Sequence, residues 1–421
     1  MTEQAKVPAI RFAGFTDPWE QRQLGELVTT TIGGGTPSTS NPAYWDGEIP
    51  WIQSSNVLED TLFDVDIPKA ITQKGLEESA AQIVPENSIA VVTHVGVGKL
   101  IYLPFQYSTS QDFISLCGLK GDARYTCYAL WKRLQEDLHI VQGSAIKGIT
   151  KEDLLEKNLP MPSVEEQAQI GVLFSQLDNL ITLHQRKYDK LVIFKKSMLE
   201  KMFPKDGESV PEIRFAGFTD PWEQRKFGDC FEFLKSNTLS RAGLNGENGT
   251  ARNVHYGDIL IKFGDCLDGE RSDLPFITDD TVLPKYAGSI LREGDVIFAD
   301  TAEDETAGKC VELRKLPKEP TISGLHTIPA RPRFPFGTGY LGHYLNSDAY
   351  HRQLLPLMQG IKVISVSKAA LQDTQVRFPG LSEQSAIGAA LNEIDSLITL
   401  HQRKLELLQN IKKSLLDKMF V

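Results

Sequence analysis

His184 and His401 could carry metal chemistry, because they occupy equivalent positions in a segment that the chain repeats. A metal pair on one helix needs a second ligand one turn further on, whereas Tyr188 and Leu405 stand at i+4. We interpret both histidines as polar residues in an apolar stripe that fix the register of paired helices, with a metal site as the alternative. The acidic stretch "DTAEDET" (300–306) is interpreted as a solvated loop rather than a cation site. The sequence therefore predicts no metal centre.

Two glycine-containing stretches could hold a phosphate or a nucleotide. "HVGVGKL" (94–100) lacks the first glycine of a P-loop and the Ser or Thr after Lys99, so we predict a strand-turn in which Lys99 could still approach a phosphate backbone. "IGGG" follows no clear strand and has no suitably placed acidic residue about 20 positions on, so a nucleotide-binding loop is not expected. "NPAY" (41–44) is similar to the (D/N)PPY loop of amino-methyltransferases, but the second half of the chain has no equivalent. We predict loop turns here and no catalytic residues.

The composition is typical of a globular protein with two or three domains. The chain has 421 residues, of which 41% are apolar, and a net charge of −10. An acidic chain binds nucleic acid poorly by itself unless its basic residues are localised or a partner supplies positive surface. Five cysteines without a CxxC pair indicate reduced thiols. No apolar run of about 18 residues and no secretory leader are visible, so a cytoplasmic location is expected.

Two blocks of sequence occur twice. "IRFAGFTDPWEQR" covers residues 10–22 and 213–225, and a longer block, in which "LITLHQRK" is unchanged, covers about 142–203 and 359–420. Each half is therefore a constant head, a variable middle and a constant tail. A surface that binds two copies of one partner must repeat itself, whereas surfaces that read two different targets must differ.

The repeated tail predicts one long helix in each half. Residues 165–202 contain no proline, and their apolar residues recur in alternating steps of three and four, as in a coiled coil. Ser163 is the predicted N-cap, and the helix is expected to end near Phe203, before Pro204. The predicted coiled-coil and partner-docking positions are Leu177, Leu180, His184, Leu191 and Met198 in the first copy and Ile394, Leu397, His401, Leu408 and Leu415 in the second.

Two like helices in one chain bury their apolar stripes best against each other, and the chain between them must return through a globular middle. This arrangement predicts an α+β fold: two mixed α/β domains joined by two long helices that form an antiparallel coiled coil, with pseudo-two-fold symmetry along one chain. We predict strands at 48–57, 88–96, 257–265 and 294–300 and helices at 125–142 and 340–359. The head that belongs with the second tail stands at the N-terminus, so the termini are expected to lie close together.

Polar loops in the middles offer side chains suited to DNA, because Ser, Thr, Asn, Gln, Arg and Lys read base edges and contact phosphates. The candidates are Thr36, Ser38, Thr39, Gln53, Ser54, Asn56 and Lys99 in the first middle and Lys235, Asn237, Arg241 and Arg252 in the second. Such residues are also common on ordinary protein surfaces, so the alternative for each is no contact with DNA.

The segments "GGTPS…NPAYWDGEIPWI", "EEQ…DNLITLHQRK…KKSMLEKMF" and "SEQ…DSLITLHQRK…KKSLLDKMF" closely resemble specificity subunits of type I restriction-modification systems. The resemblance covers nearly the whole chain, although GGTPS occurs once and the second middle starts differently, as expected of a different recognition domain. It implies the following layout: a head segment (1–22) that is the cyclic partner of the C-terminal repeat, target recognition domain 1 (23–160), a central helix (161–204), a linker with the repeated head (205–225), target recognition domain 2 (226–377) and a C-terminal helix (378–421).

The resemblance also implies a division of labour between subunits. The chain would be the non-catalytic subunit of a type I restriction endonuclease and adenine-specific DNA methyltransferase complex, with each recognition domain reading one half of a split, asymmetric target in double-stranded DNA. Two methyltransferase subunits would dock near the helices, and restriction subunits would join them. S-adenosylmethionine, ATP and magnesium would be held by those partners. The alternatives are a non-catalytic two-ended protein-protein adaptor and a methyltransferase that uses "NPAY".

Overall fold

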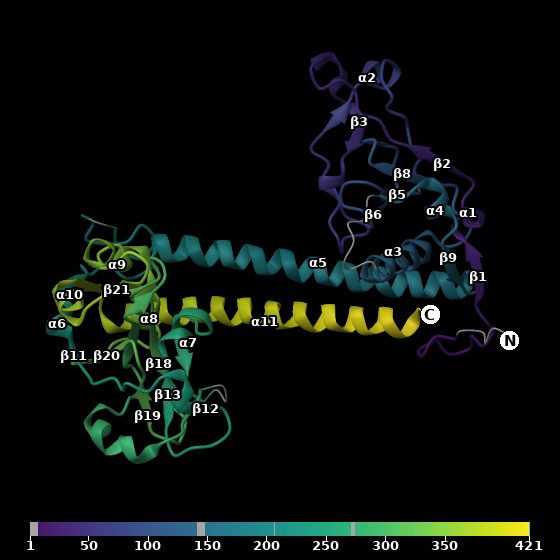
Figure 1. The fold of residues 1–421 in the computed structure, drawn as a ribbon. Coiled ribbons are helices and arrows are strands. Elements are labelled where there is room, and N and C mark those ends of the chain that lie inside the picture. Colours follow the sequence, from purple (N-terminus) through teal and green to yellow (C-terminus); the bar gives the residue numbers. More distant parts are fainter. Residues whose placement is uncertain (1–6, 141–147, 206, 271–273, 421) are drawn as a thin grey trace. The chain divides into compact units, whose positions relative to one another are not determined.

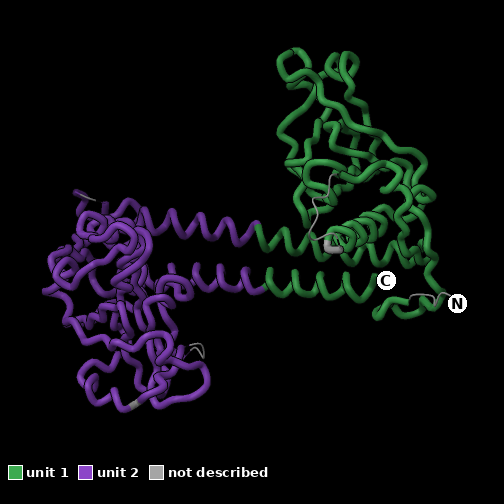
Figure 2. The backbone as a smooth tube through the Cα atoms, viewed as in Figure 1, with its two compact units in different colours: residues 1–185, 404–421 green, residues 186–403 purple. Residues whose placement is uncertain are grey.

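The computed structural model describes residues 7–140, 148–205, 207–270 and 274–420 (Figure 1). The chain divides into two compact units, unit 1 (1–185 and 404–421) and unit 2 (186–403) (Figure 2). Residues 1–6 of the predicted head segment and the end of the predicted helix at 125–142 lie outside the described residues. None of the described helices combines the length and apolarity that a membrane crossing requires.

Unit 1 contains two small sheets and a helix that covers one of them. The first sheet has the strand order β2-β8-β5-β6 and the second has the order β4-β3-β7. The strands of unit 1 are β1 (Glu20–Gln23), β2 (Thr30–Gly33), β3 (Trp45–Ile52), β4 (Ala70–Ile71), β5 (Ser88–Val92), β6 (Leu100–Leu103), β7 (Ser108–Thr109), β8 (Phe113–Cys117) and β9 (Asn158–Met161). Its helices are α1 (Leu24–Leu27), α2 (Gln73–Glu77), α3 (Ala123–Ile140), α4 (Lys151–Leu155) and the first part of α5 (Val164–Lys201).

Unit 2 is built around a different pair of sheets. One has the order β11-β20-β16-β18-β14 and the other has the order β12-β15-β13-β19. The strands of unit 2 are β10 (Glu223–Lys226), β11 (Phe231–Phe233), β12 (Leu244–Asn245), β13 (Arg252–Val254), β14 (Cys266–Asp268), β15 (Phe276–Ile277), β16 (Val296–Ala299), β17 (Thr301–Ala302), β18 (Cys310–Arg314), β19 (Thr321–Ser323), β20 (Thr327–Pro332), β21 (Ile364–Ser365) and β22 (Gln375–Phe378). Its helices are α6 (Phe227–Cys230), α7 (Tyr256–Ile261), α8 (Tyr340–Asn346), α9 (Asp348–His351), α10 (Lys368–Asp373) and the first part of α11 (Leu381–Met419).

Two predicted elements of unit 2 are wrong. The stretch 257–265, predicted as a strand, contains helix α7, whose N-terminus is capped by His255 Nδ1 accepting from Gly257 N at 3.2 Å. Its apolar run is not buried throughout, since Ile261 is 85% exposed. The helix predicted at 340–359 breaks after Asn346, because Ser347 adopts an extended conformation between α8 and α9.

Each head segment supplies one strand of a separate two-stranded sheet. The other strand of that sheet stands just before a long helix. In unit 1, β1 pairs antiparallel with β9, with Glu20 opposite Met161. In unit 2, β10 pairs antiparallel with β22, with Glu223 opposite Phe378, which is the same register of the repeat. In unit 1, Ile10 N also donates to the Lys418 carbonyl at 3.0 Å, so the N-terminal head lies beside the end of α11.

Within each unit, part of α5 packs against part of α11. In unit 1, Lys412 Nζ lies 2.6 Å from Asp178 Oδ1, and in unit 2, Lys195 Nζ lies 2.6 Å from Asp395 Oδ1. Within unit 1, Phe174 of α5 also meets Phe420, which directly follows α11, so the number on the α11 side falls from 420 to 412 as the number on α5 rises from 174 to 178, and the two segments run antiparallel. The predicted fold class, with mixed α/β domains carried on paired antiparallel helices, is confirmed.

The buried side of the helices departs from the predicted stripe. Leu405 and Leu416, which the stripe omits, are 6% and 5% exposed, whereas the predicted Leu180 is 44% exposed. A strict repeat of 3.5 residues drifts around a straight helix of 3.6 residues per turn, which moves the contact line to neighbouring positions. Ile394 is buried, and the other predicted positions are half-buried: Leu177, His184, Leu191, Met198, Leu397, His401, Leu408 and Leu415. The role of the two histidines in fixing register stays a prediction.

A buried carboxylate near the start of each long helix binds a head segment. The N-terminal head binds α5 in this way, and the second head binds α11. Ser163 Oγ accepts from Glu166 N at 3.3 Å, so the predicted N-cap is confirmed. The Glu166 side chain accepts from Arg11 Nε and Nη2 at 2.8 and 2.7 Å and from Trp19 Nε1 at 3.2 Å. In unit 2, Glu383 accepts from Arg214 Nε and Nη2 at 2.7 and 2.6 Å.

Glu166 accepts hydrogen bonds from two side chains, Arg11 and Trp19, whereas Glu383 accepts from Arg214. This difference gives a stability prediction. Glu166→Ala leaves both Arg11 and a buried indole N–H without an acceptor, and we expect it to lower the free energy of unfolding of unit 1 by about 2–3 kcal/mol. Glu383→Ala should cost unit 2 less, because Trp222 Nε1 has no hydrogen-bond acceptor among the described residues even before the change. Denaturant unfolding of both variants measures the difference, and equal losses would contradict this interpretation.

Candidate nucleic-acid interface

The glycine-rich loop of unit 1 is held by close backbone contacts. Strand β2 runs directly into Gly34, so the prediction that no strand precedes these glycines is wrong. A Cβ at Gly34 would lie 1.8 Å from the Ser110 carbonyl oxygen, and one at Gly35 would lie 2.2 Å from the Ala80 carbonyl oxygen. The glycines therefore allow backbones to cross, and the loop continues into a short 3-10 turn, Pro42–Tyr44, rather than into a nucleotide-binding helix.

Two tryptophans anchor this loop and leave its hydroxyl groups exposed. Trp51 Nε1 donates to the Gly35 carbonyl at 3.0 Å, and Trp45 Nε1 donates to the Ser38 carbonyl at 3.1 Å. The two indoles meet edge to face with centroids 5.1 Å apart. Ser38 and Thr39 are exposed on the anchored loop, which suits groups that must meet a base edge in a fixed position.

The segment 109–112 connects the loops that carry the other candidates of unit 1. Thr36 Oγ1 donates to Gln111 Oε1, and Ser110 N donates to the Ile52 carbonyl, directly before Gln53. Thr93 N donates to the Asp112 carbonyl at 2.7 Å. This contact places the first residue of the β5–β6 turn next to the same segment, and Lys99 is the last residue of that turn. The structure thus brings most candidates of the first middle into one neighbourhood.

The candidates at 53–56 have unequal freedom to bind. Asn56 Oδ1 accepts from Gln53 N at 3.0 Å as part of a local cap, so this oxygen serves the turn itself. Gln53 and Ser54 are half-buried, and their side chains remain candidates. Lys69 was not selected from the sequence. It lies over the rings of Trp45 and Trp51 at 5.8 and 5.7 Å and adds a positive charge beside the loop.

Two candidates of unit 2 have polar groups that are already used within the protein. Asn237 is 2% exposed, donates to the Ser323 carbonyl at 2.8 Å and accepts from Leu239 N at 3.0 Å. Arg252 donates to the Leu274 carbonyl at 2.8 Å, and its guanidinium lies 3.7 Å from the centroid of the Phe276 ring. These contacts hold both side chains within the fold of unit 2.

The other two candidates of unit 2 remain accessible. Lys235 is exposed and follows strand β11. Arg241 donates to Asp258 Oδ2 at 2.6 Å, yet its side chain is 54% exposed, so it keeps donors for a ligand. Whether any of these residues touches DNA stays a prediction.

Comparison with known proteins adds to this geometry. Residues 16–192 match a family described as the type I restriction modification DNA specificity domain. The chain is 24% identical over 416 residues to the type I restriction enzyme MjaVIII specificity subunit of Methanocaldococcus jannaschii, covering 95% of this chain and 92% of the relative. It is 26% identical over 308 residues to the MjaIX specificity subunit of the same organism, covering 68% and 66%. The crystal structure of the type I restriction-modification S subunit from M. genitalium aligns over 99% of both chains with a TM-score of 0.57 and 14% identity, which shows a shared fold.

The chain is similar to the specificity subunits of type I restriction-modification systems. The relatives are named as specificity subunits of type I restriction enzymes, and this agrees with the prediction that the chain is the specificity subunit rather than a catalytic subunit. The methyltransferase alternative based on "NPAY" is accordingly set aside.

The protein exposes apolar side chains at equivalent positions of its two long helices. Unit 1 exposes Leu183 by 46% and Ile411 by 38%, and unit 2 exposes Leu400 by 45% and Phe194 by 49%. Leu183 and Leu400, like Phe194 and Ile411, are related by the tail repeat. Exposed apolar residues that recur in this way mark an interaction surface better than single exposed residues do.

Sequence reasoning missed the charged residues of the helix interface. Lys195, Asp395 and their repeat equivalents were assigned no role, although the same charges stand at the same positions in both tails. Lys412 is only 9% exposed, which is rare for a lysine without a partner. Identical charges in two otherwise divergent copies were the signal that could have identified them.

Proposed function

We propose that this specificity subunit reads a bipartite, asymmetric DNA sequence, with one half-site for each unit, and docks two methyltransferase subunits. The observation that carries the proposal is the contrast between repeat and difference. The heads and tails of the two units share strand register and ion pairs, whereas the recognition sheets differ in strand order and size. A repeated frame suits two copies of one partner, and unlike sheets suit two unlike half-sites.

The partners supply the chemistry and part of the charge in this proposal. The subunit has a net charge of −10, so we infer that methyltransferase subunits close around the DNA and provide most of the positive surface. We further propose that these subunits contact the repeated exposed positions Leu183, Leu400, Phe194 and Ile411. S-adenosylmethionine, ATP and magnesium would belong to the methyltransferase and restriction subunits, which act with this chain in the cytoplasm.

A mobility-shift assay tests the proposal. The subunit is assembled with its methyltransferase partner and incubated with a pool of random duplexes, and the bound fraction is sequenced. We expect enrichment of one split sequence with two defined segments. A complex that binds the pool without enriching any sequence would favour the alternative, a two-ended protein-protein adaptor.

A further inference from the structure

The paired helices contain one buried ion pair twice. Asp178 of α5 pairs with Lys412 of α11 in unit 1, and Asp395 of α11 pairs with Lys195 of α5 in unit 2, both at 2.6 Å. Each residue of the first pair is related to its equivalent in the second by the tail offset of 217. The lysine side chains are only 11% and 17% exposed, so the charges need compensation inside the protein.

In unit 1, the recognition domain contacts the anion of this pair. Tyr128 of α3 donates its hydroxyl to Asp178 Oδ2 at 2.5 Å, and Lys412 Nζ lies 5.8 Å from the centroid of the same ring. Burial, followed by the charge of Asp178, raises the pKa of Tyr128, so the hydroxyl stays protonated and remains a donor. The domain therefore adds a neutral donor to a balanced pair.

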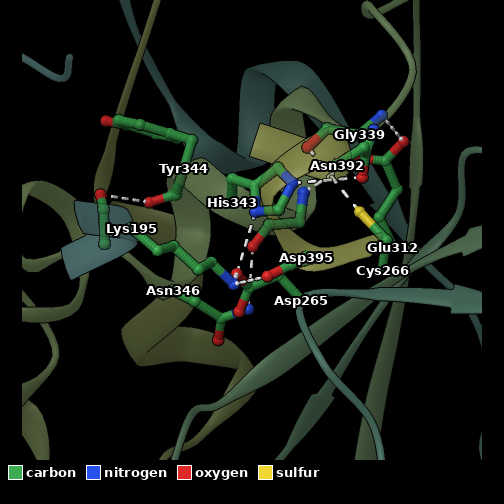
Figure 3. Close-up of polar contacts among 12 residues, drawn as sticks. Lys195, Asp265, Cys266, Glu312, Gly339, His343, Tyr344, Asn346, Asn392 and Asp395 are labelled. Atoms are coloured by element: carbon green, nitrogen blue, oxygen red, sulfur yellow. Dashed lines mark hydrogen bonds and ion pairs between the residues drawn. The ribbon is translucent and has the colours of Figure 1, made fainter. Parts of the chain in front are cut away.

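In unit 2, the recognition domain contacts the cation instead (Figure 3). Lys195 Nζ lies 2.7 Å from Asp265 Oδ2, and His343 Nδ1 lies 2.9 Å from the same oxygen. His343 Nε2 faces Asn392 Oδ1 of α11 at 3.2 Å. The two ring nitrogens thus face Asp265 of the recognition domain and Asn392 of α11, so the imidazole bridges the domain and the helix.

The charge state of Asp265 agrees with this network. Burial by itself would raise the pKa of Asp265, but the hydrogen bond with His343 and the charge of Lys195 outweigh it and lower the pKa to about 2. The ammonium of Lys195 stands between the carboxylates of Asp265 and Asp395 and takes the position that a metal ion would need.

The contacting residues occupy matching places in the two recognition domains. Tyr125 and Tyr340 each donate to the backbone oxygen of equivalent residues before the tail, and Tyr128 and His343 follow them by three residues. Leu62 is the equivalent in unit 1 of Asp265. The Leu62 carbonyl accepts from Tyr102 N of β6, and the Asp265 carbonyl accepts in the same way from Glu312 N of β18. The ion pair between the helices is thus the same in both units, while the recognition domain binds its anion, Asp178, in unit 1 and its cation, Lys195, in unit 2.

We propose that these two junctions, Tyr128–Asp178–Lys412 and Asp265–His343–Lys195–Asp395, are positioning sites that fix the angle at which each recognition domain is presented to its half-site. The inference rests on the proposed function, since presentation matters only if both domains read DNA together. Its consequence is specific. A loosened junction leaves the bases that a domain reads unchanged but relaxes the length of the unread spacer that the complex accepts.

The test uses the full subunit with its methyltransferase partner and a set of duplexes that share both half-sites and differ in spacer by one base pair at a time. Asp265→Asn keeps the shape of the side chain but removes its charge. We expect methylation at the neighbouring spacer lengths to rise about tenfold relative to methylation at the native length. A small displacement of a recognition domain can change reaction rates by at least this factor. Tyr128→Phe should do the same through unit 1.

A transplanted junction provides the matched control. Asp265→Leu combined with His343→Tyr and Asn392→Ser installs the unit 1 residues in unit 2, and spacer selection should return toward wild type. Folded variants, checked by thermal unfolding, that keep the wild-type preference for one spacer would overturn the inference. Loss of methylation at every spacer in a folded variant would overturn it too, because it would indicate a reading role. A wild-type complex that methylates no sequence would instead refute the proposed function.

Discussion

Phe420→Ala is expected to destabilise unit 1 selectively while unit 2 keeps its stability. Phe420 is 4% exposed, stacks on Tyr125 with centroids 5.3 Å apart and meets Phe174 at 5.6 Å. Truncating a buried phenylalanine costs about 3–5 kcal/mol through lost burial and the cavity that remains. That loss is a large part of the roughly 5–15 kcal/mol that stabilises an ordinary domain.

Hydrogen exchange measured by mass spectrometry checks this expectation. Peptides from α3 and β5 should lose protection in Phe420→Ala, while peptides from β16 and β18 keep it. Phe203→Ala is the matched control, because Phe203 is 1% exposed and packs against Tyr344 at 5.4 Å in the core of unit 2. The pattern of lost protection should reverse in that variant. Equal loss in both units, or no loss in either, would contradict the assignment of the two helix ends to separate cores.

Exchange of the second middle is expected to change one half-site only. Replacing residues 226–358 with the corresponding segment of another specificity subunit removes the β11–β20 sheet and leaves all of β2 to β9 in place. Each mismatched base pair costs about 1–3 kcal/mol, so loss of a half-site of several bases should weaken binding to the old target by about a thousandfold or more. Sequencing of DNA selected by the chimaeric complex measures both half-sites at once.

The outcome of the exchange also depends on the junction in unit 2. His343 travels with the exchanged segment, whereas Asn392 and Lys195 stay on the helices. A donor segment that supplies a partner for either member of the Lys195–Asp395 pair should preserve the spacer, and one that supplies neither should relax it. A change in both half-sites would contradict independent reading by the two units.

The sequence predicted the scaffold well because its signals are repeated and periodic. A long helix with regularly spaced apolar residues is stable when its apolar side packs against another surface. The repeated tail indicates that this surface is the second helix of the same kind. The position of Ser163 before the helix was enough to place the N-cap. Short elements were harder, as 257–265 shows, because a run of a few apolar residues fits a strand or a helix equally well.

The candidate site was only partly predictable, because burial of a polar residue depends on segments far away in the sequence. Asn237 was selected as a loop residue, but its amide is used by Ser323, which lies 86 positions on. Arg252 was selected for its charge, but its guanidinium lies over the Phe276 ring and donates to the Leu274 carbonyl. Conversely, nothing local to Lys69 predicts that it lies over two indoles.

The most direct measurement is the pattern of DNA methylation in cells that express this chain with its proposed methyltransferase partner. DNA from cells that express the subunit with its methyltransferase partner is read by long-read sequencing that detects methylated bases. We expect a single motif made of two unlike defined segments, separated by a fixed number of undefined bases and carrying a methylated adenine in each segment. An uninterrupted motif, or one with two identical halves, would contradict the account that two different reading units are carried on one repeated frame.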